Sequence, residues 1–245
     1  MKETIYTIPI NEAFDTECSC ALCAIQNRLE NDEIEYTLGP AMMEPDFRVN
    51  SNHKGFCKAH YKMLLDNCKA LPLALVMQTY IQQQNKVIFA EKIPEKSGKS
   101  GLFKKKSEET ALAQKIIEHI RNTDKTCIIC EKLNNTMDRY YSNLIYIWKT
   151  QSEFRTKFAS KEGFCVPHFA KLLEFAINGL NRNEFSEFYS TIMQMQEKSQ
   201  QQMYENVSAF TRLFDHNSDK KADDKVKNSI RNSIHMYSGL NCEND

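Results

Sequence analysis

The sequence predicts an all-α protein, and two observations support this fold class. Glycine and proline, which most often mark the turns between strands, number only 7 and 6 in 245 residues. Apolar residues also recur three or four positions apart over most of the chain, as they do on the buried face of a helix. Both observations argue against a protein built from many short strands.

Three helices can be placed from these patterns. In "ALAQKIIEHI" (111–120), Leu112, Ile116 and Ile120 lie on one face of an amphipathic helix. Between residues 183 and 214 the apolar residues keep a similar rhythm, which predicts one helix of about 30 residues and about 45 Å. A short helix near the C-terminus is expected to end at Gly239, because glycine is the common residue just past a helix end.

Two motifs occur twice each, which indicates a tandem duplication of a helical unit. Cys-x-x-Cys begins at Cys20 and again at Cys127, and Gly-Phe-Cys-x-x-His ends at His60 and again at His168. The predicted organisation is a helical metal-binding unit at 1–92, a flexible charged linker at 93–107, a second unit at 108–215, and a charged segment with a short helix at 216–245.

Each of these motifs is expected to open a helix. Ser19 and Thr126 precede the two Cys-x-x-Cys motifs and are good N-cap residues, so both sulfurs of a pair would lie on one face of the first turn. Pro167, inside the second Cys-x-x-His, is tolerated only in the first turn of a helix or outside one. Two helix N-termini would therefore meet at four ligands in each unit.

The four ligands of each unit have the Cys₃His composition of a structural zinc site. Positive helix N-termini favour the net charge of about −1 that three thiolates and one imidazole leave around Zn²⁺, and they lower the pKa values of the thiols. We therefore expect two zinc ions, one in each unit. The predicted ligands are Cys20, Cys23, Cys57 and His60 in the first unit, and Cys127, Cys130, Cys165 and His168 in the second.

Other interpretations of the motifs stay open at this point. Thiolate-rich sites also hold iron–sulfur clusters, here with histidine as the fourth ligand, and thiols without a metal can be redox-active. Cys18 lies close to the first pair and could substitute as a ligand, but Lys125 occupies the corresponding position in the second unit. We therefore leave Cys18 out of the predicted quartet.

The chain also resembles a known family in three stretches, "CALC", "IEYTLGPAMMEPDFRVNSNHKGFC" and "ALVMQTYI". They are similar to an uncharacterised bacterial family, a domain of unknown function, with Cys-x-x-Cys, a Leu-Gly-Pro-x-Met-Met-Glu-Pro-Asp segment and Gly-Phe-Cys-x-x-His. The similarity covers at least residues 1–90 and, through the repeated motifs, most of the remainder. It implies a soluble bacterial protein and no particular activity.

The Met-Met-Glu-Pro-Asp segment distinguishes the first unit from the second. "GPAMMEP" (39–45) aligns with "YIWKTQS" (146–152), where the helix of the second unit is predicted to continue. A loop specific to one unit is a candidate site for a ligand or partner, and its residues are Met42, Met43, Glu44, Asp46 and Arg48. The alternative is a helix terminator whose methionines pack in the core, with Asp46 and Arg48 in local ion pairs or beside the thiolates.

Charge and hydropathy limit the setting. Lys plus Arg and Asp plus Glu both number 32, so no overall positive field favours nucleic acid. The longest apolar run, "LPLALVM" (71–77), is too short to cross a bilayer, and the first residues lack the basic and apolar regions of a signal peptide. We expect a cytoplasmic protein without membrane insertion, in which the nine cysteines are thiols or metal ligands.

The sequence contains no motif for a phosphate-binding loop, a dinucleotide fold, a zinc protease or a serine hydrolase. Four protein ligands also leave no open position on a metal for substrate, so an enzymatic function is disfavoured. The expected role is a binding or adaptor protein with a protein or small-molecule partner and structural zinc. The alternatives are a redox or sensor protein with iron–sulfur clusters or zinc thiolates, and an enzyme that uses the loop at 39–48.

Overall fold

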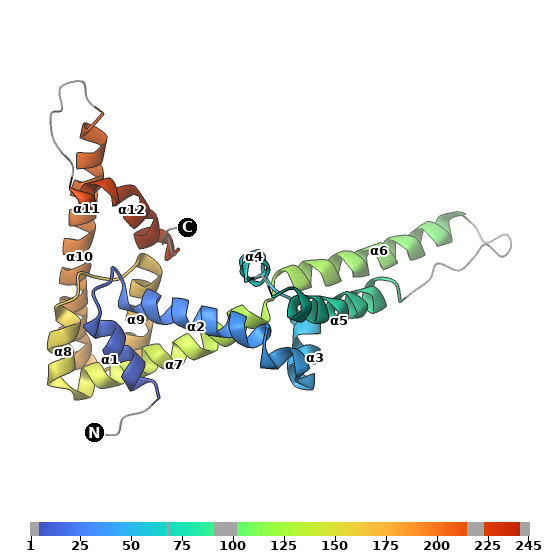
Figure 1. Ribbon diagram of the computed structural model, residues 1–245, viewed down its shortest axis with the longest axis horizontal. Helices are drawn as coiled ribbons and strands as arrows, with labels where there is room; N and C mark the ends of the chain where they lie inside the picture. The colour runs from blue at the N-terminus through green and yellow to red at the C-terminus, as the bar shows by residue number, and fades with distance from the viewer. Residues whose placement is uncertain (1–4, 68, 91–101, 215–222, 241–245) are drawn as a thin grey trace. The chain divides into compact units, whose positions relative to one another are not determined.

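The computed structural model describes residues 5–67, 69–90, 102–214 and 223–240 (Figure 1). Every regular element in these ranges is helical, which confirms the all-α prediction. None of these helices is long and apolar enough to cross a membrane. The elements are α1 (Thr7–Asp15), α2 (Ala21–Thr37), the 3-10 helix η1 (Pro40–Met43), α3 (Pro45–Lys54), α4 (Lys58–Asp66), α5 (Ala70–Ile88), α6 (Leu102–Asp124), α7 (Ile128–Thr150), α8 (Ser152–Ala159), α9 (Val166–Gly179), α10 (Arg182–Arg212), α11 (Asp224–Lys227) and α12 (Ser229–Ser238).

The order of helices repeats along the chain, in agreement with the repeated motifs. A long helix that follows Cys-x-x-Cys (α2, α7) is succeeded by a short helix (α3, α8), then by a helix that carries Cys-x-x-His (α4, α9) and by a further helix (α5, α10). The predicted long helix near the end of the chain is α10, with 31 residues. Its N-cap, Asn181, accepts from the backbone N–H of Glu184 while the Glu184 carboxylate accepts from the backbone N–H of Asn181, a reciprocal cap that fixes the helix start.

The expected linker and C-terminal segment are only partly described. α6 begins at Leu102, inside the expected linker at 93–107, while 93–101 lie outside the described residues. Within 216–245, the residues 216–222 and 241–245 also lie outside them. The predicted C-terminal helix is α12, and Gly239 ends it in the left-handed conformation at φ 70°, as expected for a glycine just past a helix.

The chain divides into two compact units whose limits differ from the expected 1–92 and 108–215. One unit is formed by Met1–Arg28 and Thr136–Asp245, and the other by Leu29–Asn135. Both α2 and α7 contribute residues to each unit. A compact unit is therefore assembled from parts of both sequence repeats.

Aromatic side chains build the core of the unit formed by 1–28 and 136–245. The Phe158 ring lies 5.4 Å from the ring centroids of both Phe164 and Phe188, and Trp148 packs edge-on against Phe188 at 5.0 Å. All four side chains are almost fully buried, and burying each phenylalanine contributes about 1.5–3 kcal/mol. Because Phe164 precedes Cys165, this core also fixes the start of α9.

The core of the unit 29–135 includes residues next to the Cys-x-x-His that ends at His60 and inside the Cys-x-x-Cys that begins at Cys127. Phe56, from Gly-Phe-Cys, and Ile129, between Cys127 and Cys130, belong to one buried cluster. Leu64 of α4 and Val76 of α5 belong to the same cluster. Hydrophobic packing therefore holds the backbone on both sides of the ligands, independently of any metal.

Candidate metal centres

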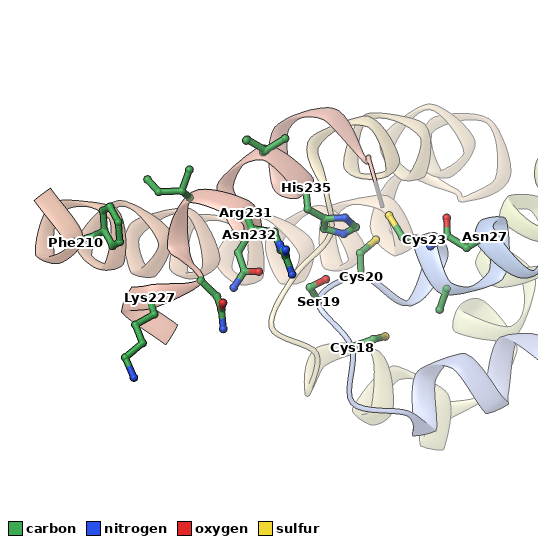
Figure 2. Close-up of a pocket in the computed structure, with 14 residues that line it drawn as sticks. Cys18, Ser19, Cys20, Cys23, Asn27, Phe210, Lys227, Arg231, Asn232 and His235 are labelled. Atoms are coloured by element: carbon green, nitrogen blue, oxygen red, sulfur yellow. The ribbon is translucent and has the colours of Figure 1, made fainter. Parts of the chain in front are cut away.

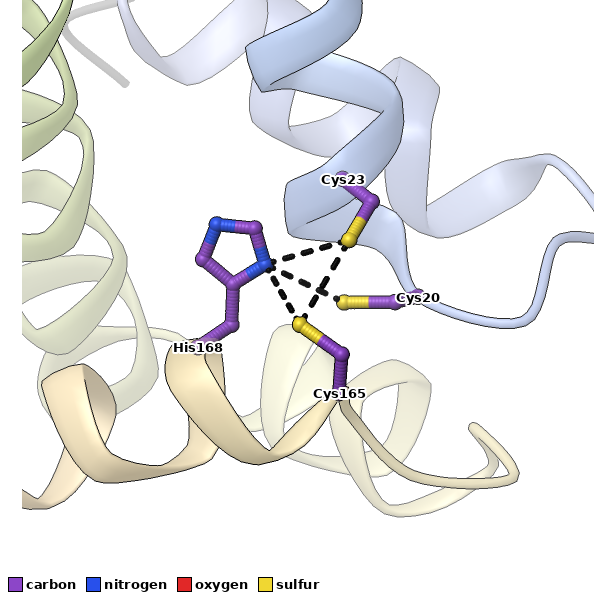
Figure 3. A group of neighbouring side chains, drawn as sticks. All are labelled: Cys20, Cys23, Cys165 and His168. Atoms are coloured by element: carbon purple, nitrogen blue, oxygen red, sulfur yellow. Dashed lines mark hydrogen bonds between the residues drawn. The ribbon is translucent and has the colours of Figure 1, made fainter. Parts of the chain in front are cut away.

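The first centre lies in the unit 1–28 and 136–245 and joins the starts of α2 and α9 (Figure 3). Its ligands are Cys20, Cys23, Cys165 and His168, all buried, and their ligand atoms lie within 4.8 Å of one another. His168 Nδ1 faces the three sulfurs at 3.6, 3.3 and 3.0 Å in that order. The Sγ atoms of Cys23 and Cys165 are 3.5 Å apart.

The second centre lies in the unit 29–135 and joins the starts of α4 and α7. Its ligands are Cys57, His60, Cys127 and Cys130, again within 4.8 Å of one another. His60 Nδ1 is 3.2 Å from the sulfurs of Cys57 and Cys127 and 3.4 Å from that of Cys130. Cys57 and Cys130 are half-buried, so this centre is closer to solvent than the first.

The grouping of the ligands corrects the prediction that each repeat completes its own quartet. The eight predicted residues do form two Cys₃His groups. However, the Cys-x-x-Cys of the first repeat joins the Cys-x-x-His of the second, and the remaining two motifs form the other group. The repeats exchange their motifs, so each centre ties together segments far apart in the sequence.

Helix length accounts for this exchange. The 17 residues of α2 carry the chain about 25 Å away from Cys20 and Cys23, and the 10 residues of α3 can return it by only about 15 Å. In the second repeat the 23 residues of α7 span about 35 Å and the 8 residues of α8 only about 12 Å. In each repeat the short helix is therefore much shorter than the long one, which favours exchange over pairing within a repeat.

The four motifs open helices as predicted, but the two Cys-x-x-Cys helices begin one position later than Ser19 and Thr126 predict. The carbonyls of Cys20, Cys57, Cys127 and Cys165 each accept the first backbone hydrogen bond of the following helix, at 2.8–3.2 Å. The first ligand of each motif is therefore the N-cap residue, and Ser19 and Thr126 lie just before it, not at the cap. The second ligand of each motif is the third residue of its helix, which places both ligands on one face.

The glycine of each Gly-Phe-Cys turns the chain into the ligand-bearing helix. Gly55 and Gly163 have φ of 62° and 147°, a region that residues with a Cβ seldom adopt. A Cβ on Gly163 would lie 2.9 Å from Cβ of Ser199, and one on Gly55 would lie 3.0 Å from the Tyr80 hydroxyl. Both backbone conformation and close packing therefore require glycine at these positions.

Two residues that the sequence analysis missed orient the histidines. His60 Nε2 lies 2.9 Å from Glu30 Oε1, and His168 Nε2 lies 2.9 Å from Gln26 Oε1. If each Nε2–H donates to its oxygen, the Nδ1 lone pair is left for a metal, which is the usual outer arrangement of a ligating histidine. The comparison of the two repeats could not identify Gln26 and Glu30, because Leu133 and Met137 occupy the corresponding positions of the second repeat.

The electrostatics of both centres favour one thiolate each even without a metal. Burial raises the pKa of Cys127, but hydrogen bonds from His60 and from the backbone N–H of Cys130 outweigh burial and lower it to about 6. The pKa of Cys20 is also lowered, because hydrogen bonds from Cys165, Cys23 and His168 outweigh its burial. A hydrogen bond with Cys20 raises the pKa of Cys165 to about 12. The remaining protons are those that a bound cation would displace.

The candidate loop of the first repeat contributes no residue to either quartet. It forms η1, followed at Pro45 by α3, whereas α7 continues to Thr150, as predicted. Met43 is 70 % exposed, while Met42 packs against the core. The Tyr36 hydroxyl donates to Glu44 Oε2 at 2.6 Å, which raises the pKa of Tyr36 to about 12.

Charged residues recur in the two repeats as Asp46 and Arg48 in the first and Glu153 and Arg155 in the second. Asp46 is exposed in the first turn of α3, and Arg48 follows on the same helix. Arg155, the counterpart of Arg48, pairs with Glu187 at 2.8 Å and donates to the carbonyl of Trp148. In the second repeat, the arginine therefore has a local structural role.

The distances in both quartets fit a single tetrahedral ion. Metal–sulfur bonds of about 2.3 Å and metal–nitrogen bonds of about 2.0 Å put sulfurs about 3.8 Å apart and sulfur and nitrogen about 3.5 Å apart. The Sγ atoms of Cys23 and Cys165 are 3.5 Å apart in the first centre, and those of Cys57 and Cys130 are 3.7 Å apart in the second. The two Cys₃His groups can therefore hold metal ions with little rearrangement.

Comparison with known proteins places the chain in a family. The model of the "Family of unknown function (DUF6062)" matches residues 1–244, so the chain belongs to this family. No curated protein matches it, and no solved structure does. The centres must therefore be interpreted from their own geometry.

Proposed function

We propose that this protein, whose family has no assigned activity, is a cytoplasmic bacterial zinc protein that acts as a binding or adaptor module. In this proposal two structural zinc ions clamp the repeats together by their exchanged motifs. The observation that carries the proposal is that each Cys₃His group combines helix starts from both repeats. An ion at either centre then cross-links distant parts of the chain, and its binding free energy becomes folding free energy.

Zinc is favoured over an iron–sulfur cluster by the size of the quartets. In a cluster the four protein ligands are distributed over two or four irons, so ligand atoms on different irons stand farther apart than those that share one ion. Here the four ligand atoms of each group lie within 4.8 Å. Three thiolates and one imidazole at this spacing are typical of structural zinc.

A structural role is favoured over catalysis because each ion would be fully coordinated. Cys20 and Cys165 are 2 % and 1 % exposed, and His168 is 5 % exposed, so the first centre offers substrate no open position. The loop with Met42, Met43, Glu44, Asp46 and Arg48 is the proposed contact surface for a protein or small-molecule partner. Its exposed methionine and the prolines at 40 and 45 support this assignment, because a rigid loop loses little entropy on binding.

A redox or sensor function is the alternative, and one observation favours it. Cys57 and Cys130 of the second centre are only half-buried, so oxidants can reach zinc-bound thiolates there. Release of zinc by hydrogen peroxide at the second centre, at concentrations that leave the first intact, would support this alternative.

Metal analysis of protein purified without chelator tests the proposal directly. We expect two zinc ions per chain and no visible charge-transfer absorption. Stoichiometric iron in a coloured protein would indicate iron–sulfur clusters in place of zinc. A chain without metal would contradict the proposal.

A further inference from the structure

The C-terminal helix α12 ends on the first metal centre. It packs against α9 and α10, and at its end a Cβ on Gly239 would lie 3.7 Å from Cys165 Sγ and 3.8 Å from Cγ of Pro167. The residue one helical turn earlier is His235. A histidine that belongs to neither quartet is therefore carried next to the ligands of the first centre.

A hollow lies between α12 and the start of α2 (Figure 2). Its volume is about 1120 Å³, and Cys20, Cys23 and His235 line it. Figure 2 shows that Cys20, at the start of α2, and His235, on α12, extend their side chains toward this hollow. A second hollow of about 750 Å³ is lined by Cys165 and, again, by His235. The imidazole thus borders both of the spaces that the ligands of the first centre line.

The hydrogen bonds of His235 define where its lone pair lies. Nδ1 is 2.7 Å from the carbonyl oxygen of Leu240 and donates its proton there, so Nε2 carries the lone pair. Nε2 is buried and has no hydrogen-bond partner among the described residues. A buried acceptor of this kind requires a donor or an electrophile. Thiolates bound to a metal carry no proton to donate, whereas an ion held by the first quartet would be an electrophile that this lone pair could bind.

We propose that His235 is a reserve ligand of the first centre, which binds the metal ion through Nε2 when Cys20 leaves it. The metal–Sγ bond of Cys20 breaks as the metal–Nε2 bond of His235 forms, and the thiolate takes a proton from water or reacts with an electrophile in the hollow. No electrons are transferred. The centre changes from Cys₃His to Cys₂His₂, and its net charge changes from about −1 to about 0.

This inference rests on the proposed metal binding and adds a function to one centre only. In the unit 29–135, His53 is exposed, and His119 Nε2 lies 2.7 Å from Gln84 Oε1. Neither offers the second centre a buried, unpartnered nitrogen. Cys127, which corresponds to Cys20 in the repeat, is therefore the matched control position.

Zinc content of four full-length variants tests the proposal, once the wild type is shown to hold two ions. We expect two ions in His235→Ala and in Cys20→Ser, but one in Cys20→Ser with His235→Ala and one in Cys127→Ser. One ion in Cys20→Ser would overturn the reserve role and leave the zinc sites standing. Two ions in the double variant would also overturn it, and would indicate Cys18 as the substitute. A wild type without two ions would instead contradict the proposed function.

A kinetic measurement covers the case in which Cys20→Ser does not fold. Chains with Cys57→Ser and Cys130→Ser, which keep only the first centre, are treated with iodoacetamide with and without His235→Ala, and released zinc is followed with a chromogenic chelator. The chain that has His235 should keep its ion after Cys20 is alkylated, so the chain with His235→Ala should release it several-fold faster. Equal release rates would overturn the proposal.

Discussion

Replacement of Glu30 by alanine should weaken zinc binding at the second centre through His60. Glu30 Oε1 lies 2.9 Å from His60 Nε2, the glutamate side chain is 24 % exposed, and the histidine side chain is 3 % exposed. Loss of such an outer partner typically costs 10–100-fold in metal affinity, or about 1.4–2.7 kcal/mol. We expect Glu30→Ala to lower the zinc affinity of the second centre about 30-fold, near the middle of this range, because the partner is a carboxylate in a mostly buried hydrogen bond.

The corresponding change at the first centre should be milder. Gln26 makes the same contact to His168 at 2.9 Å, but with a neutral amide. Neutral hydrogen bonds are roughly half as strong as charge-assisted ones, so Gln26→Ala should cost about 1 kcal/mol, or about fivefold in affinity. Glu30→Gln, which can keep the hydrogen bond without the charge, should fall between Glu30→Ala and the wild type.

Competition with a chromophoric chelator at constant pH measures these affinities. The second centre is isolated in chains with Cys23→Ser and Cys165→Ser, and the first in chains with Cys57→Ser and Cys130→Ser. Glu33→Ala is the matched control, because Glu33 lies on the same helix and pairs with Lys132 at 3.2 Å, away from the histidine. If Glu30→Ala weakens binding no more than Glu33→Ala does, the carboxylate does not support the ligand.

Three further predictions concern the metals, the turns and the loop. Removal of zinc by a strong chelator should lower the melting temperature markedly, since site formation is coupled to folding; an unchanged melting curve would show that the centres are not structural. Gly163→Ala should lower the free energy of unfolding by at least about 1 kcal/mol, because φ is 147° and the new Cβ would meet Ser199. Gly239→Asn should lower it less, because asparagine tolerates the left-handed conformation at φ 70°. Equal losses in the two variants would refute the steric argument. Met43→Ala with Glu44→Ala should keep both metals and change stability by about 0.5 kcal/mol or less while abolishing capture of the native partner in a pull-down; a large loss of stability would assign this segment to the core.

The helices could be predicted because they depend on local patterns. The apolar rhythm of 183–214 gave α10 within a residue or two, and Gly239 marked the end of α12. The start of each ligand-bearing helix was predicted as well, but Ser19 and Thr126 were chosen as caps. In the structure the first cysteine itself takes the N-cap position, because its sulfur faces the centre and its carbonyl begins the helix.

The pairing of the motifs could not be predicted from the repeat. Both repeats supply the same motifs in the same order, so pairing within a repeat and exchange between repeats are equally consistent with the spacing. The lengths of α2 and α7 decide between them, and these lengths depend on where Gly39 and Gln151 end the two helices. Gln26 was missed for a related reason, because it contacts His168, a histidine of the other repeat. Glu30 contacts His60 of its own repeat, but neither residue recurs at the corresponding position of the second repeat.

Zinc content of two double variants tests the exchange of motifs most directly. Cys23 and Cys165 belong to the same centre, while Cys57 belongs to the other. Cys23→Ser with Cys165→Ser should therefore leave one zinc ion per chain, and Cys23→Ser with Cys57→Ser should leave none. The reverse result, none in the first variant and one in the second, would show that each repeat completes its own centre and would contradict the exchange.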